Sequence, residues 1–145
     1  MNDDKLQTLI SQRDDDGYTA LHCAAYSNSF DVAVLLVQNG ASVNALTEDG
    51  WTPLHSASRW NSDSVAGLLL SQGADVNAET NGKLTPIQLA ASEKSSMKVI
   101  EILLAEPNCN VNCVNGAGDN AIELAARSSG VDSALTARDQ RLFYI

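Results

Sequence analysis

The stretch that decides the fold is Trp51-Thr52-Pro53-Leu54-His55-Ser56-Ala57, followed further on by Gly73-Ala74-Asp75-Val76-Asn77. An earlier copy reads Tyr18-Thr19-Ala20-Leu21-His22-Cys23-Ala24, a later one reads Leu84-Thr85-Pro86-Ile87-Gln88-Leu89-Ala90, and a weaker fourth begins at Asp119. The anchors Thr19, Thr52 and Thr85 are 33 residues apart, and Asn120 follows after 35. A fixed period in this range indicates a solenoid of stacked helical units.

At these residues the chain resembles the ankyrin repeat. The pattern is Gly-x-Thr-Pro-Leu-His, then two small residues, a Leu-Leu helix and Gly-Ala-Asp-Val-Asn. The resemblance implies an all-α ankyrin-repeat solenoid, in which helix-turn-helix repeats are joined by short β-hairpin loops. We expect one domain over residues 1–145, with an N-terminal half-repeat cap at 3–13. Four repeats follow at about 14–46, 47–79, 80–114 and 115–145.

Composition and charge exclude some classes of function for this chain. The 145 residues are 44% hydrophobic, which is ordinary for a folded domain, and the net charge is −9. That charge argues against direct nucleic-acid binding, which needs clustered Lys and Arg. No signal peptide opens the chain, and its longest helix-like apolar run, residues 32–37, is far too short to span a bilayer. We expect an intracellular protein, cytoplasmic or nuclear, that is monomeric alone.

The cysteines do not form a recognisable site. Cys23, Cys109 and Cys113 are too few and too irregular for a disulfide scaffold, so we expect reduced thiols. Cys109 and Cys113 are four apart, but no second Cys or His pair follows at zinc-site spacing. We therefore expect neither a metal nor a cofactor.

Helical periodicity predicts how the outer helices pack. Residues 3–13 read as the outer helix of an incomplete repeat, with Leu6, Leu9 and Ile10 on one apolar stripe. In repeat one, Val32, Leu35 and Leu36 should share the buried face. The ankyrin frame places Phe30 in the core.

Repeat three departs from the pattern. Its turn glycine is Gly82, one residue early, and one extra residue lies between Ala91 and Val99. Pro107-Asn108-Cys109-Asn110 replaces the usual Gly-Ala-Asp, which predicts a longer loop and looser packing. Repeat four has little Leu-Leu character, and we expect fraying at this end of the stack.

The two histidines, His22 and His55, stand three residues after a capping Thr. That spacing is typical of a capping box, and Gln88 and Glu123 take the same place in the later copies. An enzyme using His55 with a neighbouring acid is the competing hypothesis, but the sequence has no matching nucleophile or titratable pair. We therefore expect no catalytic residues and no enzyme.

Aromatic placement predicts the binding site. Tyr18 and Trp51 follow turn glycines, while Tyr26 and Trp60 end inner helices. The ankyrin resemblance implies that such positions line the concave face, formed by hairpin tips and inner helices, and contact a protein partner. Tyr, Trp and Arg are also enriched among binding hot spots. The other residues assigned to this face by register are Asp49, Arg59, Lys83, Leu84, Ser92 and Glu93. The chain is thus predicted to be a non-enzymatic interaction module or adaptor.

Three alternatives stay open. The tryptophans could merely cover their hairpins. The chain could instead be a regulatory or inhibitory subunit whose acidic surface occupies a basic site on its partner, in which case binding should weaken steeply with salt. A narrower resemblance within the family, over residues 49–61, implies a role in gene regulation, although no basic stretch supports nuclear import.

The resemblance also marks two asparagines. Asn44 and Asn77 resemble ankyrin asparagines that become β-hydroxylated. The competing interpretation is structural, in which each Asn ties down its own loop through hydrogen bonds.

Overall fold

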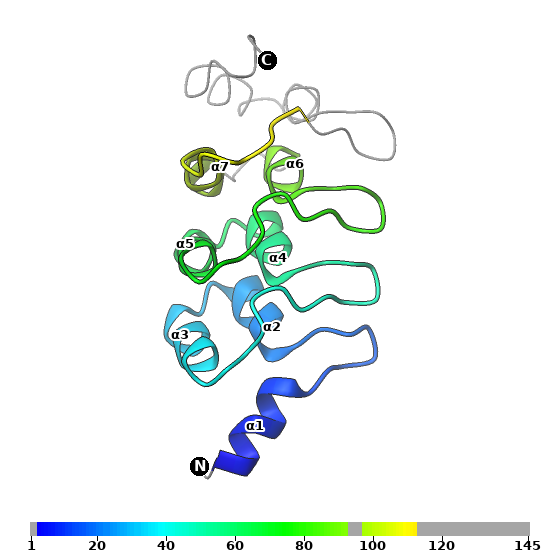
Figure 1. The fold of residues 1–145 in the computed structure, drawn as a ribbon, viewed down its shortest axis with the longest axis vertical. Coiled ribbons are helices and arrows are strands. Elements are labelled where there is room, and N and C mark those ends of the chain that lie inside the picture. The colour runs from blue at the N-terminus through cyan, green and yellow to red at the C-terminus, as the bar shows by residue number, and fades with distance from the viewer. Residues whose placement is uncertain (1–2, 93–96, 113–145) are drawn as a thin grey trace.

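The computed structural model describes residues 3–92 and 97–112, which form a single stack of helices. Figure 1 shows two parallel rows, with long loops, here called fingers, projecting from one side. The inner row holds α2 (Ala20–Ser27), α4 (Pro53–Arg59) and α6 (Pro86–Ala91), and the outer row α3 (Phe30–Gln38), α5 (Asp63–Ser71) and α7 (Met97–Leu104). The short N-terminal helix is α1 (Asp3–Ser11). The predicted all-α solenoid is confirmed, and no strand occurs in the described residues.

Local signals start and stop the helices as the sequence predicts. Thr19 and Thr52 are N-caps, each completing a capping box with the histidine three residues later. At the other end of α3, Gly40 is left-handed with φ of 95°. Its N–H donates to the Val37 carbonyl at 3.1 Å, and the next N–H donates to the Leu36 carbonyl at 3.0 Å. This Schellman motif closes α3 and turns the chain toward the next finger.

Each finger is a tight hairpin held by backbone hydrogen bonds. In finger two the Thr47 N–H donates to the Trp51 carbonyl at 3.0 Å, and Gly50 is left-handed with φ of 80°. In finger three the left-handed residue is Lys83, with φ of 63°. The prediction that Gly82 is the turn glycine is therefore wrong. The Lys83 N–H donates to the Thr80 carbonyl at 2.9 Å, as the Gly50 N–H does to the Thr47 carbonyl in finger two, so Lys83 takes the place of the turn glycine.

The core lies between the two rows of helices. Ala24 and Ala25 of α2 are buried, as expected for small residues that let helices approach. On α3 the predicted buried face is wrong in part, because Val32 and Leu35 are 50% and 51% exposed. The buried residues are Ala33 and Leu36. Val32/Leu35 and Ala33/Leu36 are adjacent i, i+3 rows, so spacing alone did not determine which one faces the core.

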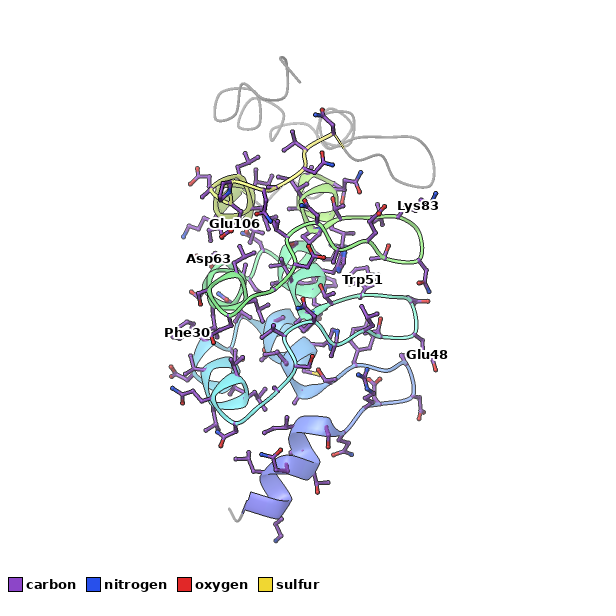
Figure 2. The ribbon with its side chains drawn as sticks, in the orientation of Figure 1. Phe30, Glu48, Trp51, Asp63, Lys83 and Glu106 are labelled. Atoms are coloured by element: carbon purple, nitrogen blue, oxygen red, sulfur yellow. The ribbon has the colours of Figure 1, made fainter. Side chains whose placement is uncertain are left out.

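Phe30 corrects a second core prediction. It is 45% exposed and lies on the outer side of the stack, away from the fingers (Figure 2). It is the first residue of α3, where the chain has only just left the turn after α2. The ring therefore projects past the packed part of the helix.

Helix α1 lies beneath α2, in line with the inner row, rather than in the predicted outer position (Figure 1). Ile10 lies only seven positions before Gly17, whereas Leu36 lies fourteen before Gly50, so most of the loop that leads from an outer helix into a finger is missing here. Ile10 is buried and Leu6 packs against the core, whereas Leu9 of the predicted stripe is exposed. The Gln7 side chain also donates to the Asn39 carbonyl at 3.1 Å.

The irregular loop after α7 is not loosely packed where the structure describes it. Cys109 and Val111 are buried in the core, at the positions that Ala74 and Val76 occupy one repeat earlier. Asn77 Nδ2 donates to the Asn108 carbonyl at 2.7 Å. The expectation of looser packing is therefore wrong for this loop. The extra residue near 93–96, Cys113 and repeat four lie outside the described residues.

The asparagines link neighbouring repeats. Asn44 Nδ2 donates to the Gly73 carbonyl at 3.3 Å, and Asn44 Oδ1 accepts from the Asp75 N–H at 3.0 Å. Both partners lie in the loop one repeat later, so the interpretation that each Asn ties down its own loop is wrong. Asn77 repeats the pattern with the loop after α7.

Candidate functional site

A groove opens where the fingers meet the inner helices of repeats one and two. It encloses about 300 Å³. Two walls are aromatic: Tyr18 and Trp51 come from the bases of fingers one and two, and Tyr26 and Trp60 from the ends of α2 and α4. The remaining lining residues are Asp14, His22, Cys23 and Ser56. We call this cavity the aromatic groove.

The aromatic rings are held by contacts with one another. Tyr26 and Trp60 meet edge to face, with centroids 4.9 Å apart. The Arg59 guanidinium lies 4.5 Å from the centroid of the Trp60 ring. Edge-to-face aromatic pairs contribute about 0.5–1.5 kcal/mol beyond area burial, so this wall is partly ordered in the unbound chain.

The helix-side wall is the more accessible one. Tyr26 is 59% exposed and Trp60 is 47% exposed, although both are large apolar side chains. Tyr18 and Trp51 are half-buried. Tyr18 packs against His22 at 5.5 Å between centroids, and Trp51 against His55 at 6.1 Å. Each finger-side ring therefore contacts a capping histidine and also lines the groove.

The histidines beneath the groove are structural. The Thr19 N–H donates to His22 Nδ1 at 3.2 Å, so that nitrogen is unprotonated. His22 Nε2 then carries the proton and donates to the Trp51 carbonyl at 2.9 Å. His55 has the same pair of bonds, to the Thr52 N–H and the Leu84 carbonyl. Burial lowers the pKa of both imidazoles, which favours the neutral ring that these bonds require.

This arrangement confirms the predicted capping role and extends it. Each histidine caps its own helix and also holds the next finger through a carbonyl 29 residues away. Since both ring nitrogens are engaged, neither histidine is placed to act as a general base. The enzyme hypothesis based on His55 thus gains no support from the geometry.

Carboxylates surround the finger end of the groove. The pKa of Tyr18 is raised, first by burial and then by the negative charges of Asp49, Asp16 and Asp14. Asp14 also lines the groove, and its Oδ1 accepts from the N–H groups of Asp16 and Tyr18, both at 2.9 Å. These bonds fix the Asp14 carboxylate at the mouth of the cavity.

The other predicted site residues lie along the same side of the stack. Asp49 and Lys83 are exposed at the fingertips, and Figure 2 shows Lys83 at the end of its finger. Leu84 is half-buried at the base of finger three. Ser92 is half-buried at the end of α6, where its hydroxyl donates to the Leu89 carbonyl at 2.7 Å. Glu93 lies outside the described residues.

Sequence reasoning missed the floor of the groove. Cys23 and Ser56 line it, and Asp14, at the mouth, is a further lining residue that was not among the predicted ones. Cys23 and Ser56 each stand directly after a capping-box histidine, and that register was the available signal. Cys23 is a free, exposed cysteine.

The described residues contain neither a group of metal ligands nor a helix that could span a membrane. Over 3–92 and 97–112, no group of three or more His, Cys, Asp or Glu side chains is placed to hold a metal ion. None of the helices in this part of the chain has the length and apolar character needed to cross a membrane.

Comparison with known proteins identifies the family. A family model described as "Ankyrin repeats (3 copies)" matches residues 2–80, and one described as "Ankyrin repeat" matches residues 83–116. The chain belongs to the ankyrin-repeat family. Repeats of this family are generally non-enzymatic modules for protein–protein interaction.

A curated human protein is similar over most of the chain. Ankyrin repeat domain-containing protein 49 from Homo sapiens is 57% identical over 122 residues. The match covers 84% of this chain and 51% of the relative. The ankyrin-repeat chain thus spans about half the length of the curated relative that it matches.

Proposed function

We propose that this ankyrin-repeat domain is an interaction module or adaptor that binds a protein partner through the aromatic groove. The observation that carries the proposal is the gathering of four aromatic side chains around one cavity, from two fingers and two helices. Two of the four, Tyr26 and Trp60, are about half exposed. Large apolar side chains exposed together in a cavity mark an interaction site.

Rigidity supports the same proposal. The fingers that hold Tyr18 and Trp51 are joined to each other, since the Glu48 N–H donates to the Asp16 carbonyl at 3.0 Å. His22 connects finger two to α2. A surface already fixed in this way loses little conformational entropy on binding, so more of the contact energy appears as affinity.

The direct test removes both tryptophans from the groove. A Trp51→Ala, Trp60→Ala variant should lose a partner that the natural chain captures from cell lysate. Truncation of hot-spot residues costs about 2 kcal/mol or more, which lowers affinity by roughly 30-fold or more. The quantitative measurement is titration of the recovered partner against both proteins.

The matched control is Phe30→Ala, Leu35→Ala, which removes two exposed apolar side chains from the outer helix α3. It should keep the partner, and circular dichroism should show that both variants are folded. If the partner binds the double tryptophan variant as well as the natural chain, the rings only cover their hairpins and the proposal fails.

One observation favours the acidic-surface alternative. Exposed carboxylates cluster on fingers one and two, at Asp15, Asp16, Glu48 and Asp49. A domain that acts mainly through this charge should lose its partner as ionic strength rises, whereas aromatic burial is far less sensitive to salt. The role in gene regulation that the narrower resemblance implies stays a prediction, to be checked by the compartment in which the recovered partner is found.

A further inference from the structure

We propose that the side chain that enters the aromatic groove is an arginine, presented by a basic segment of the partner protein. The inference rests on the proposed function and names the chemistry that the groove selects. It is carried by three features of the described residues: the size of the cavity, its aromatic walls and the carboxylates at its mouth.

The size fits a single long side chain. A volume of about 300 Å³ is at the lower end of the range for ligand pockets. The cavity lies between the bases of two fingers and the ends of two helices, and it is open to solvent. A folded element is too wide for this space, whereas one extended side chain from a bound segment is not.

The walls suit a cation. An aromatic ring has a negative face, and a guanidinium or ammonium group within about 6 Å of the ring centroid is attracted to it. The chain already makes one such contact, with the Arg59 guanidinium 4.5 Å from the Trp60 centroid. Four aromatic rings line the cavity, so a planar cation that enters it can stack on a ring face.

The charge at the mouth also suits a cation. Asp14 lines the groove, and Asp16 and Asp49 are close enough to act on the Tyr18 hydroxyl. Among the described residues that line the groove there is no Lys or Arg. Two basic side chains lie close by: the Arg59 guanidinium stacks on Trp60, and Arg13 donates to the Gly17 carbonyl at 3.0 Å and to the Leu46 carbonyl. Three carboxylates thus act on Tyr18 at the finger end of the groove, which favours a cationic occupant.

Arginine satisfies both features better than the other side chains. An acidic group would be repelled, and an aliphatic one would leave the carboxylates uncompensated. Lysine carries the charge but is compact and more strongly hydrated, whereas the guanidinium is planar, stacks on aromatic faces and can pair with a carboxylate through two donors.

The test uses the tryptophans as reporters. The chain has two tryptophans, Trp51 and Trp60, and both line the groove, so intrinsic fluorescence reports its occupancy. The probes are acetyl-Gly-Ser-X-Ser-Gly-amide peptides in which X is arginine, citrulline, lysine or norleucine. Citrulline keeps the shape of arginine and removes its charge, and norleucine keeps only the aliphatic stem.

The arginine peptide should bind about 3- to 30-fold more tightly than the citrulline and norleucine peptides, with lysine in between. Equal binding of norleucine and arginine would overturn the inference, because the groove would then be a plain apolar docking site. Absence of a fluorescence change with the arginine peptide up to millimolar concentration would also overturn it. In both cases the capture experiment with the double tryptophan variant still decides the proposed function separately.

A matched pair of variants tests whether the Asp14 carboxylate is the charge that favours arginine. Asp14→Asn removes the carboxylate at the mouth but keeps an Oδ1 that can accept from the Asp16 and Tyr18 N–H groups. It should reduce the preference for arginine over citrulline several-fold and leave norleucine binding unchanged. Asp31→Asn makes the same charge change on the exposed outer helix α3 and should have no effect. Equal effects of the two variants would mean that only overall charge matters, and the groove would not be the arginine site.

Discussion

At the scale of single residues, the capping histidines connect local and long-range structure. The Thr-x-x-His spacing was enough to predict the cap, because both partners lie within one helical turn. It could not predict the bond from His22 Nε2 to the Trp51 carbonyl, whose partner lies 29 residues away. That second bond appears only when the repeats stack, and it requires a neutral ring.

The neutral rings give a pH dependence whose sign follows from their lowered pKa. The unfolded chain binds protons near the ordinary histidine pKa of about 6.5, while folded His22 and His55 bind them only at lower pH. The contribution of the two neutral histidines to the free energy of unfolding should therefore be fully present above about pH 7, and it should fall as the pH drops below about 6.5. The slope cannot exceed about 1.4 kcal/mol per pH unit for each histidine.

Urea unfolding of the natural chain and of His22→Gln, His55→Gln between pH 7.5 and 5.5 measures this dependence. Glutamine is the matched replacement, because Gln88 occupies the same place in repeat three and its Oε1 accepts from the Thr85 N–H at 2.8 Å. The double variant should show a much flatter profile. The same slope in both proteins would show that other groups are responsible.

At the scale of helices, the outer helix α5 is capped from the neighbouring repeat. Ser62 is the N-cap residue of α5, but its side chain makes no cap hydrogen bond. Instead Asn28, in the turn after α2, accepts from the Val65 N–H at 3.2 Å through Oδ1 and donates to Asp63 at 3.3 Å. Asn28 is left-handed, with φ of 54°, and asparagine tolerates that conformation better than most residues.

Two substitutions separate these roles of Asn28. Asn28→Gly keeps the left-handed backbone and removes the cap, which should cost about 1 kcal/mol of unfolding free energy. Asn28→Ala removes the cap and also forces a Cβ into the left-handed region, which should add about another 1 kcal/mol. Chemical denaturation gives both values. A glycine variant as stable as the natural chain would show that the bond between repeats contributes nothing.

The element scale also shows where sequence reasoning stops. Repeat period, caps and closing glycines are local, and they predicted the inner helices and the first two fingers correctly. The exposure of Val32 and Phe30 and the inner-row position of α1 depend on which neighbour each helix meets. A single chain's periodicity does not contain that information. Register along the chain is local, and it assigned Tyr18, Tyr26, Trp51 and Trp60 to one face. That Cys23 lines a cavity together with them depends on packing.

At the scale of the whole molecule, many of the hydrogen bonds and packing contacts join adjacent repeats. Fingers two and three are joined by the Asn81 N–H, which donates to the Asp49 carbonyl at 3.0 Å. The loops that follow the outer helices are joined by the side chains of Asn44 and Asn77, each of which donates to a carbonyl of the next loop. Inner helices pack on inner helices and outer on outer. A stack held by nearest-neighbour contacts has a stability that is approximately a sum of repeat and interface terms. Damage at one end should therefore not unfold the other end at once.

Substitution in repeat three tests this property. Ile100 is fully buried on α7, and Ile100→Ala should cost about 2–5 kcal/mol. Because Trp51 and Trp60 both lie in repeat two, fluorescence reports the centre of the stack, whereas circular dichroism reports all helices. In the variant, part of the helical signal should disappear at lower urea than the fluorescence change. Leu54→Ala, fully buried within repeat two itself, should shift both transitions together. Coincident transitions in Ile100→Ala would contradict this expectation and show that the repeats unfold as one cooperative unit.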